Sequence, residues 1–127
     1  MTKRDYLIYV VDDDESVRRG MTRLLKASGF NVQTYESALA FLGDAPVTHN
    51  ACLVLDIDMQ GMSGLKLVEH MIDSGVNLPT ILITAHELAR GQHSRLTSVL
   101  GCLMKPFTKK DLLDLIEEGL LRLRRSS

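Results

Sequence analysis

The sequence predicts an α/β fold in which a doubly wound, five-stranded parallel sheet is flanked by about five helices. Two observations lead to this prediction. Short apolar runs, typical of strands buried on both faces, alternate with segments whose apolar residues recur at the three- and four-residue spacing of a helix. Strict alternation of these two patterns favours right-handed crossovers between parallel strands, with helices on both faces of the sheet.

The first two strand–helix units occupy the N-terminal third of the chain. The first strand is expected over residues 7–11, and the helix after it should end at Gly29. The apolar face of that helix is formed by Val17, Met21, Leu24 and Leu25. A second strand over residues 31–35 then leads into a short helix that Ser37 can cap and Pro46 ends.

The third unit begins with a strand over residues 51–55. Ser63 is the expected N-cap of the following helix, and Ser74-Gly75 closes it. The apolar stripe of this helix is formed by Leu65, Val68 and Ile72. A fourth strand over residues 80–83 follows Pro79.

The C-terminal third is less regular. Residues 87–100 carry only a ragged helical stripe interrupted by Gly91, which predicts a short or mobile helix. A fifth strand is expected over residues 101–104. Thr108 resembles an N-cap for the last helix. The stripe of that helix is formed by Leu112, Leu115, Ile116 and Leu123.

Length and composition describe an ordinary globular protein. The chain has 127 residues, of which 45% are apolar and 24% charged, with a net charge of −1. We therefore expect residues 1–127 to form a single domain with a core of about 6–123 and no effector domain, and without direct nucleic-acid binding. No apolar run reaches the roughly 18 residues of a membrane span, so a cytoplasmic location is expected. Cys52 and Cys102 are expected to be reduced thiols.

Charged and polar residues follow several of the predicted strands. Asp12 and Asp13 come directly after the first strand, Asp56 after the third, Thr84 after the fourth and Lys105 after the fifth. The carboxyl ends of parallel strands meet at one edge of a sheet, where open α/β sheets place their chemistry. These side chains are therefore expected to lie together.

Three crowded carboxylates need cations beside them. The charges of one Mg²⁺ and the Lys105 ammonium would sum to zero with those of the Asp12, Asp13 and Asp56 carboxylates. Mg²⁺ in proteins is typically held by one or two carboxylates, waters and a phosphate oxygen, which makes a phosphoryl group the expected ligand. The hydroxyl of Thr84 can donate a hydrogen bond to such a group, and Asp56 can act as a carboxylate nucleophile.

These residues stand in four motifs that occur together in one protein family. The motifs are Val10-Val11-Asp12-Asp13, Leu55-Asp56 with Met59-Gln60-Gly61-Met62-Ser63-Gly64, Thr84-Ala85, and Lys105-Pro106-Phe107. From about Tyr6 to Leu123 the chain resembles a response-regulator receiver domain of two-component signalling. The resemblance implies a flavodoxin-like sheet with strand order 2-1-3-4-5.

The resemblance also implies a role for each residue of the predicted site. Asp56 would accept a phosphoryl group from a sensor histidine kinase or a histidine phosphotransfer protein. Thr84 and Lys105 would contact the transferred group, and the Lys105-Pro106 bond would be cis. The implied ligands of Mg²⁺, or of Mn²⁺ as a substitute, are Asp13, Asp12 through a water, Asp56 and the backbone carbonyl of Asp58.

The chain departs from the family pattern near the implied switch. Cys102 stands where relatives usually carry an aromatic residue, and Gln60 stands where proline is frequent. The segment between Thr84 and Lys105 is one residue shorter than in common relatives. These departures leave the implied phosphorylation chemistry intact but predict an unusual route from the site to the output.

Two other functions are compatible with parts of the pattern. Asp56-Ile57-Asp58 has the spacing of the nucleophile and acid in haloacid-dehalogenase-like phosphatases, although their nucleophile normally follows the first strand. A receiver-like module that acts without phosphorylation is the other alternative. Asp12 and Asp13 can also merely begin a loop and cap the first helix. Separately, the side chains of Asp58 and His86 are candidates for controlling the access of water to the phosphoryl group.

The output is not encoded in these motifs. The overall pattern resembles receivers that precede LuxR-type helix-turn-helix domains, which implies a transcriptional output. The last helix carries extra apolar residues, so a partner surface or a homodimer formed on phosphorylation is a further expectation, with ordinary packing as the alternative. These residues are Leu113, Leu120 and Leu121.

Overall fold

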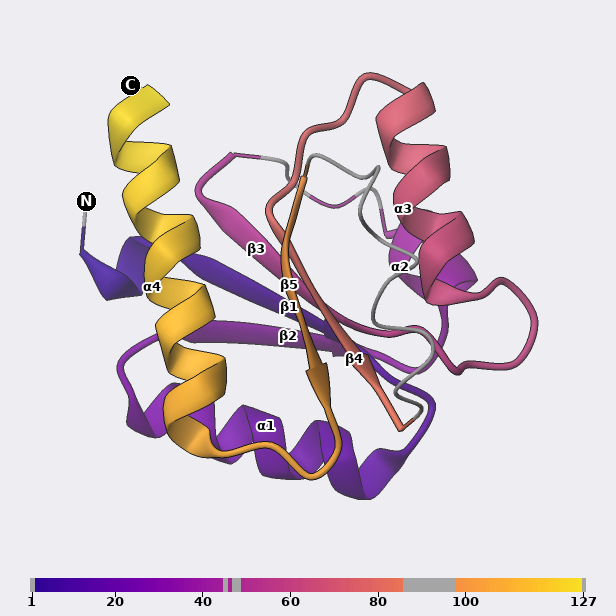
Figure 1. Ribbon diagram of the computed structural model, residues 1–127, viewed down its shortest axis with the longest axis horizontal. Helices are drawn as coiled ribbons and strands as arrows, with labels where there is room; N and C mark the ends of the chain where they lie inside the picture. Colours follow the sequence, from indigo (N-terminus) through magenta and orange to yellow (C-terminus); the bar gives the residue numbers. More distant parts are fainter. Residues whose placement is uncertain (1, 45, 47–48, 86–97, 127) are drawn as a thin grey trace.

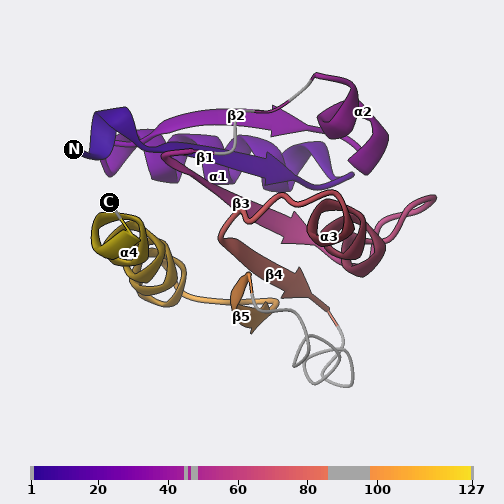
Figure 2. The ribbon, with the colours of Figure 1, turned by 90° about the horizontal axis from the view of Figure 1, so that it is seen from above.

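The computed structural model describes residues 2–44, 46, 49–85 and 98–126. Five parallel strands form one sheet in the order β2-β1-β3-β4-β5, as predicted (Figures 1 and 2). The strands are β1 (Leu7–Val11), β2 (Asn31–Tyr35), β3 (Ala51–Asp56), β4 (Thr80–Thr84) and β5 (Val99–Met104). The reversal of strand order beside β1 places the carboxyl ends of β1 and β3 next to each other, which is the usual location of a binding site in such sheets.

Helices cover both faces of this sheet (Figure 1). After a short 3₁₀ turn at Lys3–Asp5, the described residues contain four α-helices. These are α1 (Glu15–Ala27), α2 (Ala38–Gly43), α3 (Gly64–Asp73) and α4 (Lys109–Ser126). The helix predicted over residues 87–100 falls almost entirely on residues 86–97, which lie outside the described residues.

The start of β5 corrects one prediction. Val99 and Leu100, assigned from the sequence to the end of a helix, belong to this strand, because Val99 pairs with Thr80 of β4. The ladder between β4 and β5 has an irregularity just after that pair, between Thr80 and Ile81. A ragged apolar pattern at an irregular strand end resembles a weak helical stripe, which explains the error.

The core has two halves, one on each face of the sheet. Alternate residues of β1 and β3 point to opposite faces, so that Tyr9 and Leu53 pack with α2 and α3, whereas Ile8 and Val54 pack with α1 and α4. Every residue of β3 and β4 is buried. The site-bearing ends of these strands are therefore held by packing on both faces.

Local signals at the helix ends largely match the predictions. Ser37, Ser63 and Thr108 each accept a hydrogen bond from a backbone N–H in the first turn of the following helix, at 3.0, 3.3 and 3.1 Å. Gly29 and Gly75 adopt positive φ angles of 97° and 80° just beyond α1 and α3.

The apolar residues of α4 serve mostly for packing. Leu120 is buried, and Leu113 packs against the same core cluster. Only Leu121 of the three leucines considered for a partner surface is well exposed, at 47%. Ordinary packing therefore accounts for two of them. Over the part of the chain that the structure describes, no helix has the length and apolar character needed to cross a membrane.

Candidate functional site

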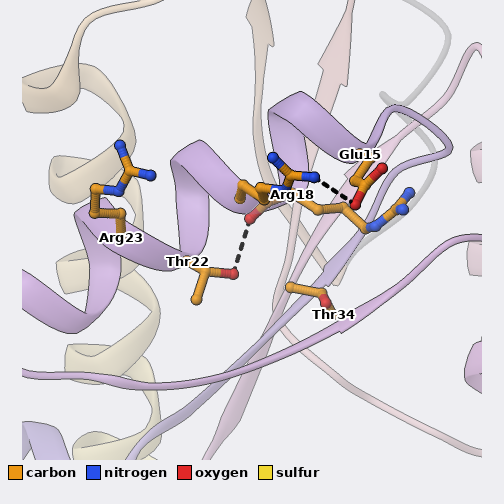
Figure 3. A pocket seen from close by; sticks show the side chains of 6 residues that line it. Glu15, Arg18, Thr22, Arg23 and Thr34 are labelled. Carbon is orange, nitrogen blue, oxygen red and sulfur yellow. Dashed lines mark hydrogen bonds and ion pairs between the residues drawn. The ribbon is translucent and has the colours of Figure 1, made fainter.

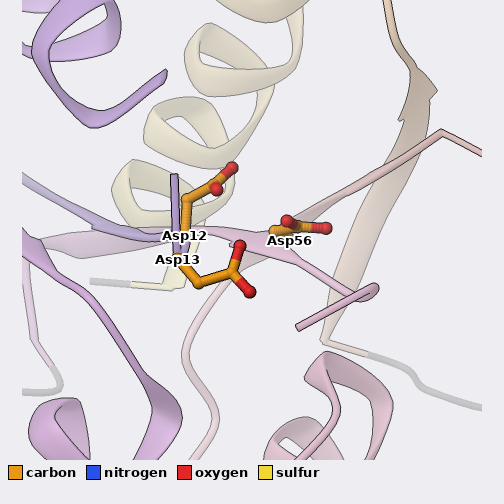
Figure 4. Close-up of side chains that lie close together, drawn as sticks. All are labelled: Asp12, Asp13 and Asp56. Carbon is orange, nitrogen blue, oxygen red and sulfur yellow. The ribbon is translucent and has the colours of Figure 1, made fainter. Parts of the chain in front are cut away.

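Three carboxylates meet at the carboxyl edge of the sheet, as the strand ends predicted (Figure 4). Asp12 and Asp56 follow Val11 and Leu55, which are paired across β1 and β3, so the register alone places the two side by side. Asp13 joins them, and one oxygen of each carboxylate lies within 4.8 Å of the others.

The helix-cap alternative for Asp12 and Asp13 is wrong. Asp14 caps α1 instead, because its carboxylate accepts hydrogen bonds from the N–H groups of Ser16 and Val17 at 2.8 and 3.3 Å. Oδ1 of Asp12 accepts a hydrogen bond from the N–H of Asp14 at 2.9 Å, just before α1 begins. Capping therefore leaves Oδ2 of Asp12 available to the site.

Two of the three carboxylates are removed from solvent. Asp12 is 1% exposed and Asp56 4% exposed, whereas Asp13 is exposed. Burial raises the pKa of Asp56 above its ordinary value, and the charge of Asp12 acts in the same direction, while the N–H of Asp58 and the ammonium of Lys105 oppose the shift. The charged form of Asp56 is thus costly without further cations.

Lys105 supplies one positive charge to this cluster. Its Nζ lies 3.5 Å from Oδ2 of Asp12 and 3.7 Å from Oδ2 of Asp56. The backbone fixes its origin, since the N–H of Lys105 continues the sheet ladder by donating to the carbonyl of Thr84 at 2.8 Å. The Lys105-Pro106 peptide bond is cis, as the family resemblance implied.

The donor set fits a small divalent cation. All three groups are carboxylates, the ligand type that hard cations such as Mg²⁺ prefer. Oδ2 of Asp12 is buried and has no hydrogen-bond partner, although Lys105 lies nearby. A buried oxygen without a hydrogen bond is unusual, and a metal ligand is one of the few roles that explains it. The backbone carbonyl of Asp58 as a further ligand stays a prediction.

Thr84 and Asp58 are connected in a way that the sequence did not reveal. Thr84 is fully buried at the end of β4, and its Oγ1 donates to Oδ2 of Asp58 at 3.1 Å. The N–H of Ala85 donates to the same oxygen at 2.8 Å. Asp58 lies at the surface, yet its carboxylate accepts hydrogen bonds from Thr84 and Ala85 at the end of β4 and is not simply solvated.

The backbone around Asp56 is held from two directions. The N–H of Asp58 donates to Oδ1 of Asp56 at 2.9 Å. On the other side, a Cβ added to Gly64 at the start of α3 would lie 2.7 Å from the Cα of Ile57 and 2.8 Å from the carbonyl oxygen of Asp56. Only glycine allows α3 to approach this closely.

Arg18 on α1 was also missed. Its Nη1 donates to the backbone carbonyl of Asp12 at 2.6 Å, which ties the end of β1 to the helix. Arg18 lines a shallow pocket between α1 and β2 together with Thr22, Arg23 and Thr34 (Figure 3). Its position six residues after Asp12 was the only signal in the sequence, and many exposed arginines on helices have the same spacing.

Among the residues that the structure describes, His49, His70 and the two cysteines lie outside the carboxylate cluster. His49 and His70 are exposed. The tuning candidate His86 lies outside the described residues. Cys52 is buried and Cys102 partly buried, and neither forms a disulfide. Cys102 pairs with Leu82 of β4 and packs against the core cluster beneath α2 and α3.

Sequence and structure comparisons identify what this arrangement is similar to. The sequence model of the response regulator receiver domain family matches residues 8–117 of this chain. The transcriptional regulatory protein TdiR of Thauera aromatica is 39% identical over 115 residues, covering 89% of this chain and 50% of TdiR. The transcriptional regulatory protein FixJ of Rhizobium meliloti is 35% identical over 116 residues, covering 91% of this chain and 57% of FixJ.

A solved structure extends the similarity to three dimensions. The crystal structure of FixJ-N superposes with a TM-score of 0.82 at 34% identity and covers 91% of this chain and 94% of that one. The chain spans about half the length of the curated relatives named above.

Proposed function

The chain belongs to the response regulator receiver domain family of two-component signalling, and we propose that Asp56 is its phosphoacceptor. The observation that supports this assignment most strongly is the position of Asp56. It is the last residue of β3, it is buried, and its carboxylate lies beside those of Asp12 and Asp13 and 3.7 Å from the ammonium of Lys105. Asp12 is also buried but lies beyond the end of β1, and Asp13 is exposed.

The proposed reaction is a direct phosphoryl transfer. An oxygen of Asp56 forms a bond to phosphorus while the P–N bond of a phosphohistidine breaks. The electron pair of that bond stays on the imidazole nitrogen. Such transfers need positioning and charge stabilisation more than covalent help from the protein. The N–H of Asp58, which binds Oδ1 of Asp56, leaves Oδ2 on the side of Lys105.

The cluster provides the charge stabilisation. Asp12, Asp13, Asp56 and the carbonyl of Asp58 would hold Mg²⁺, or Mn²⁺ in its place. When bound, the ion would neutralise the carboxylates and the incoming phosphoryl oxygens. Lys105 is near enough to both buried carboxylates to shift to a phosphoryl oxygen without leaving the site. Thr84 and the N–H of Ala85 are the remaining donors at this edge.

The family and its named relatives support a proposal for the donor and the output. We infer that a sensor histidine kinase or a histidine phosphotransfer protein supplies the phosphoryl group. FixJ and TdiR are transcriptional regulatory proteins, which favours a transcriptional output for the protein that carries this chain. A homodimer formed on phosphorylation remains part of the proposal, although α4 offers only Leu121 as an exposed large apolar residue. A receiver is a signalling domain and not a metabolic enzyme.

A mass measurement tests the phosphoacceptor assignment. The protein is incubated with Mg²⁺ and a small acyl-phosphate donor, and its intact mass is compared with that of the Asp56→Asn variant. One labile phosphoryl adduct is expected on the wild type and none on the variant. A wild type that binds Mg²⁺ yet forms no adduct would instead support the phosphorylation-independent module. Release of phosphate from small monoesters would support the phosphatase alternative.

A further inference from the structure

The carboxylate of Asp58 gathers two donors from the end of β4 onto one oxygen. The hydroxyl of Thr84 and the N–H of Ala85 both point to Oδ2, at 3.1 and 2.8 Å. Hydrogen bonds to an ionised acceptor are stronger than those between neutral groups. Residue 58 therefore has more than a solvent contact, and it holds the end of β4 in a defined position beside Asp56.

The same two donors face the place that a phosphoryl group on Asp56 would occupy. Asp56 pairs with Ile83 across β3 and β4, so Thr84 and Ala85 are the first residues beyond that pair. The N–H of Asp58 binds Oδ1 of Asp56, which fixes the backbone between the two aspartates. Asp58 thus lies between the phosphoacceptor and the donors of β4.

Both acceptors cannot use these donors fully at once. A phosphoryl group adds close to two negative charges and three strong acceptor oxygens. It would face the Asp58 carboxylate across the same hydroxyl and N–H, and two anions at such a distance repel each other. Either Asp58 or the phosphoryl group then takes the donors.

We propose that Asp58 is a positioning residue whose carboxylate competes with the phosphoryl group for the hydroxyl of Thr84 and the N–H of Ala85. Before phosphorylation Asp58 holds both donors. Phosphorylation transfers them to the phosphoryl oxygens and releases the Asp58 side chain. This inference rests on the proposed phosphoacceptor function of Asp56, and it names a contact that opposes the phosphorylated state.

The competition predicts an unusual direction of effect. Removing a side chain beside a binding site normally weakens binding, but here Asp58→Ala frees two donors and should strengthen the binding of a phosphoryl mimic. The probe is beryllofluoride in the presence of Mg²⁺, with affinity measured by titration. An increase of about tenfold is expected, since one net hydrogen bond to a charged group corresponds to at least that factor.

Two further variants separate competition from simple charge repulsion. Asp58→Asn removes the charge but keeps an oxygen that can accept from Thr84, so its affinity should lie between those of the wild type and Asp58→Ala. Equal gains in the two variants would leave only charge repulsion and overturn the proposal. In a Thr84→Ala background the gain from Asp58→Ala should shrink, because one of the two contested donors is gone. Asp73→Ala, at an exposed aspartate on α3, is the matched charge control and should leave the affinity unchanged.

The amide proton of Ala85 gives a direct readout. In the wild type without ligand, the chemical shift of this proton should be that of a hydrogen-bonded amide. Asp58→Ala should abolish that shift, and adding beryllofluoride to the variant should restore it. Beryllofluoride binding to the wild type with no gain in Asp58→Ala would overturn the competition while leaving the phosphoacceptor assignment intact. No binding to the wild type with Mg²⁺ present would overturn both.

Discussion

At the scale of single residues, the site combines burial with charge in a way that costs stability. Asp12 and Asp56 are almost fully enclosed, and among the described residues Lys105 is the cation within 4 Å of both. One ammonium cannot neutralise two buried carboxylates and the nearby Asp13. The metal-free protein is therefore expected to be strained electrostatically at the very point where a divalent cation and a phosphoryl group would bind.

Neutralising Asp56 should therefore stabilise the metal-free protein. At pH 7 we expect Asp56→Asn to raise the free energy of unfolding by roughly 1–3 kcal/mol, the scale on which replacing buried ionic groups stabilises proteins. Folding raises the pKa of Asp56, so the native wild type binds this proton more readily than the unfolded chain. The advantage of the variant is thus fully present above the raised pKa. This advantage is lost as the pH falls from the raised pKa toward about 3.9, the pKa of an aspartate in the unfolded chain.

Urea unfolding in metal-free buffer at several pH values checks this prediction. Asp73→Asn, at an exposed position on α3, is the control and should not change the stability by more than about 0.5 kcal/mol. A destabilised Asp56→Asn variant at pH 7 would show that Lys105 and the N–H of Asp58 already compensate the charge.

Lys105 should matter for the transfer step more than for folding. We expect Lys105→Met to slow phosphorylation by an acyl-phosphate donor by roughly 10²-fold, the usual cost of removing one donor that stabilises developing charge. Its affinity for Mg²⁺ should not fall, because a competing cation has been removed from the carboxylates.

Lys110→Met is a suitable comparison for this experiment. Lys110 is exposed on α4 and pairs with Asp114 one turn away, so its loss removes the same charge without touching the site. Phosphorylation rates measured by intact mass should separate the two variants. Similar rates for both would mean that Lys105 acts only through net charge.

At the scale of elements, the site depends on how closely α3 approaches the end of β3. Gly64 allows this approach, since a Cβ there would fall 2.7 Å from the Cα of Ile57. The neighbouring backbone is that of Asp56 itself, whose carbonyl lies 2.8 Å from the same position. The packing of α3 and the placement of Asp56 therefore depend on each other.

Substitution of Gly64 should therefore affect stability and phosphorylation together. Gly64→Ala is expected to destabilise the fold by roughly 1–3 kcal/mol, as overpacking does, and to slow phosphorylation by displacing Asp56. Gly20→Ala on α1 is the control, because a Cβ there meets nothing within 4 Å. That control should be neutral or stabilising by up to about 1 kcal/mol. Unfolding and phosphorylation measured on both variants test the claim, which fails if Gly64→Ala is as well tolerated as Gly20→Ala.

The elements also show what sequence patterns can and cannot predict. The bounds of β1 and β2 were predicted to the residue, because short apolar runs ended by polar residues have little freedom. The cluster of Asp12, Asp13 and Asp56 followed from strand ends alone. The contacts of Arg18 with Asp12 and of Thr84 with Asp58 were not predicted. They join residues on different elements through side-chain directions that periodicity does not encode.

At the scale of the whole molecule, metal binding and folding should be coupled. The strands that carry Asp12 and Asp56 are adjacent in the sheet only when the domain is folded, so the unfolded chain offers no comparable site. A ligand that binds only the native state stabilises it by mass action. We expect Mg²⁺ at one hundred times its dissociation constant to add about 2.7 kcal/mol to the free energy of unfolding.

The carboxylates themselves provide the comparison for this effect. Asp13→Asn should lose most of the Mg²⁺-dependent stabilisation while changing the metal-free stability little, since Asp13 is exposed. Thermal unfolding with Mg²⁺ and with a chelator measures both quantities. Equal stabilisation of the wild type and of Asp13→Asn would place the ion elsewhere.

Reductive trapping identifies which carboxylate accepts the phosphoryl group. Borohydride converts a phosphorylated aspartate to homoserine, and peptide mapping by mass spectrometry then locates the modified position. After treatment with Mg²⁺ and an acyl-phosphate donor, we expect homoserine at position 56 alone. Modification at position 12, 13 or 58, or an unmodified chain under conditions in which Mg²⁺ binds, would contradict the account.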